Sequence, residues 1–205
     1  MAVLTGDGRV LQVDLQGDAV RAAQGSMVAY TGSVEFTSAG AGGGDGFRAA
    51  LKRKAAGESL ALMQCSGRGR VHLAVDAQHV SVIDLDADTL SVESESLLAV
   101  GPGLRLDVAF AGLSGAMSGQ GVATTTVTGT GQVAVLSDGP LIALEVAPGA
   151  PLVVDPDAFV ASTGRLSTAI VSGVSWRSVV GEGSGEAFSM RFDGEGLVCI
   201  QPAER

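Results

Sequence analysis

One short motif occurs three times in this chain of 205 residues. It consists of glycine, any residue, glycine, any residue and valine, and it occupies residues 67–71, 129–133 and 194–198. The first glycines of the copies lie 62 and 65 residues apart, and each copy follows another matched glycine: Gly57, Gly119 and Gly185. Self-similarity at such a period indicates one supersecondary unit that is copied along the chain and stacked.

A second block repeats upstream of the motif, at residues 26–30, 96–100 and 158–162. Together the two blocks predict three units at about residues 10–75, 79–137 and 140–202. Since no linker-like stretch separates the units, we expect residues 1–205 to form a single domain with approximate three-fold symmetry.

Within each unit the apolar residues have the spacing of strands. Residues 12–15 alternate between polar and apolar, and the apolar runs 82–85 and 141–146 are flanked by Asp or Gly. Hydrophobic residues make up 46% of the chain but aromatic residues only 4%, so the core must consist of Val, Leu, Ile and Ala. These features predict an all-β fold with a closed or doubled sheet, which leaves few open edges.

Glycine is expected to supply many of the turns. Thirty glycines stand against six prolines, and the Gly-x-Gly motif itself is interpreted as a tight turn that follows a short strand. Asp-Gly pairs at residues 7–8, 45–46, 138–139 and 193–194 are typical of hairpin turns.

One segment departs from this pattern and predicts a short helix. Residues 47–56 follow a run of glycines, consist of good helix formers and place Phe47, Ala50 and Leu51 on one helical face. Four of the thirteen cationic residues of the chain belong to this helix: Arg48, Lys52, Arg53 and Lys54. The other two units have no counterpart of it.

The ordered set of residues 25–29, the glycine run 42–44 before Leu51-Lys52-Arg53-Lys54, and residues 57–60 resembles the Altered Inheritance of Mitochondria twenty-four family. The resemblance extends over nearly the whole chain. It implies three copies of the unit of the tryptophan RNA-binding attenuation protein, a short double-stranded β-helix. The mitochondrial relatives are associated with inner-membrane organisation, so the resemblance implies a non-catalytic interaction role. It brings no catalytic residues, and RNA binding does not follow from a shared fold.

Charge and composition narrow the functional classes. The formal charge of −9 opposes binding of nucleic acid. No apolar run approaches the roughly 18 residues that a membrane-spanning helix needs. Residues 1–10 also lack a basic flank followed by an apolar stretch, so a cytoplasmic location is expected. Cys65 and Cys199 lie far apart without a Cys-x-x-Cys pair, which favours buried thiols over a disulfide or a metal site.

The sequence also lacks the usual catalytic constellations. His72 and His79 are its two histidines, and no His-x-His precedes a carboxylate, so a metal site is not expected. Residues 112–116 lack the final glycine of a nucleophile elbow, and the glycine runs lack the lysine of a phosphate loop. We therefore predict that the chain is not an enzyme and needs no cofactor.

The candidate functional residues are Arg48, Lys52, Arg53, Lys54 and Trp176. The basic helix could lie against an anionic membrane surface or an acidic protein. Alternatively, Phe47 and Leu51 pack the helix against the β-strands, while its charged side chains face water. Trp176, the single tryptophan, is an interface anchor if it is exposed and a packing residue if it is buried.

These observations predict a non-enzymatic interaction or scaffold protein, with a homo-oligomer as one expected form. Its rigid β-rich core would present the basic helix and the insertion of the third unit that contains Trp176 to a protein partner or an anionic membrane surface. The alternative is a small-molecule-binding β-module with a pocket between repeats or between subunits.

Overall fold

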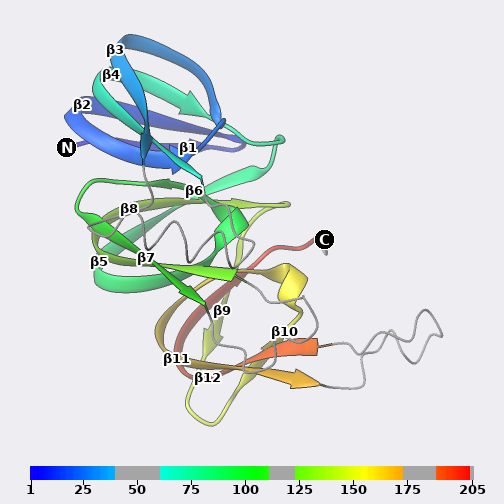
Figure 1. The fold of residues 1–205 in the computed structure, drawn as a ribbon. Coiled ribbons are helices and arrows are strands. Elements are labelled where there is room, and N and C mark those ends of the chain that lie inside the picture. The colour runs from blue at the N-terminus through cyan, green and yellow to red at the C-terminus, as the bar shows by residue number, and fades with distance from the viewer. Residues whose placement is uncertain (40–60, 111–122, 173–187, 204–205) are drawn as a thin grey trace.

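A computed structural model describes residues 1–39, 61–110, 123–172 and 188–203 (Figure 1). These residues form twelve β-strands and two short 3-10 turns, and no α-helix occurs among them. The predicted all-β class is confirmed, while the predicted helix at residues 47–56 lies outside the described residues. The strands are β1 (Val3–Asp7), β2 (Val10–Ala23), β3 (Met27–Ala39), β4 (Leu62–Leu73), β5 (His79–Glu93), β6 (Leu97–Val100), β7 (Leu104–Phe110), β8 (Ala123–Ser137), β9 (Ile142–Val146), β10 (Leu152–Val154), β11 (Phe159–Ser172) and β12 (Phe188–Ile200), and the 3-10 turns are η1 (Ser94–Ser96) and η2 (Pro156–Ala158).

The twelve strands belong to one antiparallel sheet with two open ends. Its main path runs β10-β12-β11-β5-β8-β6-β2-β4-β3, while β1 adds to β2, β7 to β8 and β9 to β12. Figure 1 shows the sheet folded into three tiers, formed by β1–β4, β5–β8 and β9–β12. The expectation of a closed sheet is wrong for the described strands, because β3 and β10 terminate the path in the two outer tiers.

Each tier is arranged around one long strand that carries the glycine motif. β4 lies between β2 and β3, β8 lies between β5 and the pair β6 and β7, and β12 lies between β11 and the pair β9 and β10. The motif valine of each tier pairs with a strand on either side. The paired positions are Val71 with Val13 and Tyr30, Val133 with Ile83 and Val100, and Val198 with Leu144 and Ser162.

The interpretation of Gly-x-Gly as a turn is wrong, because all three copies lie inside long strands. The glycines are needed where neighbouring strands approach closely. A Cβ atom at Gly69 would overlap the carbonyl oxygen of Thr31, and one at Gly196 would overlap that of Thr163. Only glycine permits such an approach without moving the adjacent backbone.

The Asp-Gly pairs are used in different ways. Asp7-Gly8 forms the predicted hairpin, since Asp7 pairs with Val10 and Gly8 has a φ of 61°. Asp193-Gly194 instead lies within β12, and the pair at 138–139 links β8 to β9, which do not pair with each other in the described structure. The pair at 45–46 lies outside the described residues. An Asp-Gly pair therefore does not identify a tight turn by itself, because such a pair also occurs inside a strand where glycine relieves crowding with its neighbour.

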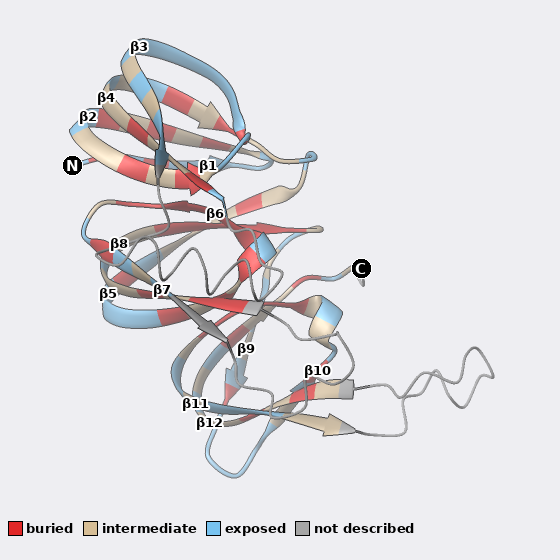
Figure 2. Cartoon of the chain, in the orientation of Figure 1, coloured by how far each residue is buried: buried red, intermediate tan, exposed pale blue. Residues whose placement is uncertain are grey.

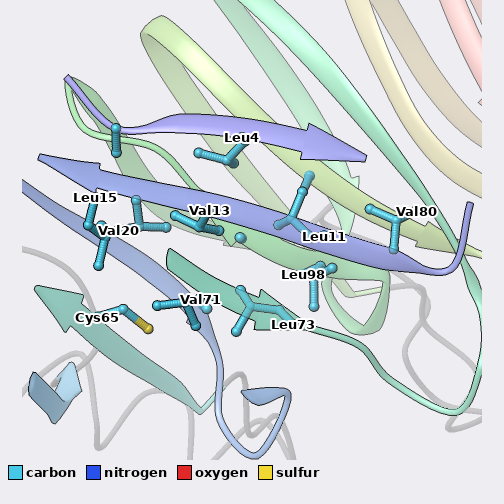
Figure 3. Close-up of a cluster of buried hydrophobic side chains, with 14 of the residues drawn as sticks. Leu4, Leu11, Val13, Leu15, Val20, Cys65, Val71, Leu73, Val80 and Leu98 are labelled. Atoms are coloured by element: carbon cyan, nitrogen blue, oxygen red, sulfur yellow. The ribbon is translucent and has the colours of Figure 1, made fainter. Parts of the chain in front are cut away.

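The buried side chains form three clusters, one for each tier. Figure 2 shows buried residues, in red, in all three tiers. The first is built from aliphatic residues such as Leu11, Val13 and Val71, and Figure 3 shows Leu98 of the second tier among them. A core of Val, Leu, Ile and Ala was predicted, and the buried members of the first two clusters are Val, Leu and Ala together with Cys65. The third differs, because Phe159 and Phe192 stack in it with their ring centroids 5.5 Å apart.

Candidate interaction surface

The first and second tiers are joined where β2 pairs with β6, and we call this strand pairing between tiers the first joint. Arg21 pairs with Val100, and Ala22 pairs with Ala99. Leu98 and Ala99 are fully buried in the cluster of the first tier, although both belong to the second tier. β6 therefore completes the core of the tier that precedes it.

The second and third tiers are joined in the same manner, where β5 meets β11. Residues 90–92 pair with residues 161–163, with Val92 opposite Ala161. Val160 and Ala161 are fully buried in the cluster of the second tier. Here too, a strand of the later tier inserts its side chains into the core of the earlier one.

A polar contact reinforces each joint. Arg21 donates a hydrogen bond from Nη2 to the carbonyl oxygen of Leu104 at 2.6 Å. Burial lowers the pKa of the Arg21 guanidinium, but arginine stays charged in proteins, so this is a charge-assisted bond. At the second joint, the hydroxyl of Thr163 donates to Oδ2 of Asp88 at 2.8 Å. The two contacts differ in chemistry but both tie one tier to the next.

The incoming strand uses the same position in both joints. In each joint, the later tier contributes a residue that also lies opposite the motif valine of its own tier. Val100 is opposite Val133, and Ser162 is opposite Val198. In the first tier this position is held by Tyr30, opposite Val71. The β3 segment around Tyr30 thus corresponds in register to the segments that form the joints.

That segment of β3 is exposed. β3 pairs with β4 and with no other strand in the described part of the chain. Figure 2 shows β3 largely pale blue, whereas β6 is red along its length. The relative exposures are 37% for Met27, 59% for Val28 and 49% for Tyr30, against 1% for Leu97, 0% for Leu98 and 0% for Val100. An exposed apolar segment whose counterparts are buried is typical of an interaction surface.

β10 is the second open end of the sheet. It pairs with β12 alone among the described strands, and Val153 lies opposite Arg191, three residues before Gly194. Arg21 and Ser91 hold the same position relative to their own glycine motifs, and both are paired across a joint. Val153 is 54% exposed. It marks the place where a further incoming strand would pair.

His72 is the residue after the motif valine of the first tier. Its counterpart in the second tier is Ala134, the residue after the motif valine, which is buried in the cluster of the preceding tier. Nδ1 of His72 is shielded from solvent and has no hydrogen-bond partner among the described residues. Buried polar atoms normally have a partner, so this one is unusual.

The residues predicted from the sequence to bind a partner lie outside the described residues. This holds for Arg48, Lys52, Arg53 and Lys54, for the helix that would carry them, and for Trp176. Their role at a membrane surface or protein interface stays a prediction.

Sequence reasoning identified the segments 26–30, 96–100 and 158–162 as a repeat but missed that they form the joints. A usable signal was present. Each segment contains two successive apolar residues: Met27-Val28, Leu97-Leu98 and Phe159-Val160. Because side chains alternate between the faces of a strand, two successive apolar residues indicate that both faces are covered.

The two cysteines are free thiols, as the sequence predicted. Cys65 is buried in the first cluster, and burial raises the pKa of its thiol to about 11. Cys199 is half-buried, and burial raises its pKa as well. Both thiols are poor nucleophiles near neutral pH, because the thiolate is the reactive form.

Neither a metal cluster nor a membrane-spanning helix is found among the described residues. No group of three or more His, Cys, Asp or Glu side chains is placed to hold a metal ion. No helix among these residues is long and apolar enough to cross a membrane.

The fold and its joints define an all-β protein whose tiers share strands of one continuous sheet. The family model described as "Mitochondrial biogenesis AIM24" matches residues 1–203, and the chain belongs to this family. The family resemblance inferred from the sequence is thereby confirmed.

A solved structure has the same fold. The crystal structure of protein SPYM3_0169 from Streptococcus pyogenes is similar with a TM-score of 0.77 and 22% sequence identity, covering 100% of this chain and 94% of that chain. At this identity the likeness extends to the fold alone. Among proteins with curated descriptions, none matches this chain.

Proposed function

We propose that this chain is a non-enzymatic interaction protein that binds a protein partner through the open ends of its sheet. One observation carries the proposal. Val28 of β3 is exposed, whereas the residues in the same register, Leu98 of β6 and Val160 of β11, are buried in the core of the preceding tier. Covering apolar surface is the main driving force of protein association.

The proposal includes the view that the tiers are copies of one unit, related by approximate three-fold symmetry as in the attenuation-protein fold. Three features support it. The glycine motif lies in the central strand of each tier, the motif valines have corresponding partners, and both joints use the same register. A copied unit would explain why the first tier has a joint-forming segment although no tier precedes it among the described residues.

The proposed function is tested by placing a photoreactive amino acid at position 28 in the full chain, expressed in its own host. Val3 is the control position, because it is 47% exposed but lies on β1, which pairs with β2 and is not one of the two strands that end the path of the sheet. We expect adducts with protein from position 28 and none from position 3. Equal labelling at the two positions, or no protein adduct from position 28, would contradict an interaction surface on β3.

A further inference from the structure

We infer that the partner of β3 is β10 of a second copy of this chain. Residues 29 and 30 of one copy would pair with residues 153 and 154 of the other, and the sheet would continue from copy to copy. The inference rests on the proposed function, and it specifies both the occupant and the register.

The register follows from the two joints within the chain. At the first, Arg21 is opposite Val100 and Ala22 is opposite Ala99. The equivalent residues at the second joint pair in the same way: Ser91 is opposite Ser162, and Val92 is opposite Ala161. The equivalent residues of β10 and β3 would place Val153 opposite Tyr30 and Val154 opposite Ala29. Both halves of this third joint exist in the chain, and each is unpaired on its outer edge among the described strands.

The apolar side chains also complement each other. Leu98 enters the first cluster and Val160 the second, both from the following tier. Val28 is the corresponding residue of the first tier, and it is exposed. The third cluster contains no side chain from another tier among the described residues and has six buried members, compared with fifteen and eleven in the other two. Val28 of a second copy would fill the place that Leu98 and Val160 fill within the chain.

The chain cannot make this joint with itself. β3 and β10 end the sheet in opposite outer tiers, with the second tier between them (Figure 1). Because the two edges differ, the contact is heterologous, so copies add head to tail and form either a closed ring or an open filament. The formal charge of −9 on each copy opposes association, so added salt should strengthen it.

The register is tested with two single-cysteine additions, Tyr30→Cys and Val153→Cys, mixed after separate purification and oxidised. We expect disulfide-linked dimers in the mixture and not in either variant alone. The matched control replaces Tyr30→Cys by Val3→Cys and should give no dimer. Cys65 and Cys199 are present in every sample, and their shielding and raised pKa keep their background low.

Two results would overturn the inference. Dimers of Tyr30→Cys alone would mean that β3 pairs with β3 in an isologous contact. The absence of dimers from every sample would mean that β3 and β10 do not meet. If position 28 captures a different protein in the host while the mixture stays unlinked, the proposed function survives and the second copy is excluded.

Sedimentation velocity provides the second test. Wild type should sediment as a species larger than a single chain of 20.5 kDa. Val28→Asp should raise the dissociation constant by about tenfold or more, since a buried valine would be replaced by a charge, while Val3→Asp should leave it unchanged. Because Val28 is exposed in the single chain, the substitution should not impair folding. A wild type that stays a single chain at the highest reachable concentration would contradict the inference.

Discussion

β6 and the first residues of β3 occupy the same place in neighbouring tiers, yet one is buried and the other exposed. All four residues of β6 are buried, whereas residues 27–38 of β3 include none that is buried. Both segments are apolar at their first two positions and pair with the central strand of their own tier. What distinguishes them is the presence of a preceding tier, because β6 packs against the first tier and β3 has nothing before it in the described chain. Burial here is a property of position in the series of tiers and not of the segment alone.

The largest expected effect contrasts Leu98→Ala with Val28→Ala. Leu98→Ala should lower the free energy of unfolding by about 2–5 kcal/mol, since it removes a fully buried side chain and leaves a cavity at the first joint. Val28→Ala should change it by less than about 0.5 kcal/mol, as is usual for surface positions. Urea unfolding, at a protein concentration low enough to keep the chains separate, measures both. Equal losses would mean that Val28 is buried within the single chain, and the comparison would fail.

A smaller effect is expected from the polar contact of the first joint. Arg21→Ala should lower the free energy of unfolding by about 1–3 kcal/mol, because it removes a charge-assisted hydrogen bond to the carbonyl oxygen of Leu104. Lysine cannot reproduce the planar guanidinium, so Arg21→Lys should restore only part of the loss. Urea unfolding measures both variants. Full stability of Arg21→Ala would mean that the strand pairing alone holds the joint.

The second joint should respond more weakly. Thr163→Val keeps the shape of the side chain but removes the hydroxyl that donates to Asp88, so we expect a loss of about 0.5–1.5 kcal/mol. Ser167→Ala is a suitable control, because its exposed hydroxyl makes a longer hydrogen bond of 3.3 Å within the third tier. Thermal unfolding followed by circular dichroism should rank Thr163→Val below the control. The opposite ranking would show that the hydroxyl of Thr163 is not involved in joining the tiers.

The smallest effect concerns an ion pair inside the first tier, away from the joints. The hydrogen bond from Arg70, at 2.7 Å, is the largest cause that lowers the pKa of Asp14 below its usual value of 3.8. The folded-state pKa is below the unfolded one, so the stabilisation is present above the unfolded pKa and is lost as pH falls through the folded pKa. Since the pair is substantially exposed, Asp14→Asn should cost only a few tenths of a kcal/mol at neutral pH. The difference from wild type should shrink in acid unfolding titrations as the pH falls through the lowered folded-state pKa of Asp14. A difference that persists there would assign the effect to packing and not to charge.

The sequence predicted local properties well and connections between tiers poorly. The all-β class, the aliphatic composition of the first two clusters and the free thiols followed from residue types and spacing. The Gly-x-Gly motif was misinterpreted, because glycine is favoured both in turns and where two strands approach closely, and the sequence does not separate these causes. The joints were missed, because the pairing of residues 21–22 with 99–100 depends on strands far apart in the chain and leaves no local periodicity. The one local indication of the first joint was the pair of successive apolar residues at 97–98.

Because residues of a later tier complete the core of the earlier one, the joints also affect how the chain folds during translation. The first cluster includes Leu98, Ala99, Ala134 and Leu136, so the amino-terminal tier cannot complete its packing until residue 136 has left the ribosome. The second cluster likewise waits for residues 160 and 161. Most multi-unit proteins fold from the amino terminus as each unit emerges. This chain must instead hold its early strands unfinished through much of translation, when their apolar faces are most open to chaperones and to neighbouring nascent chains.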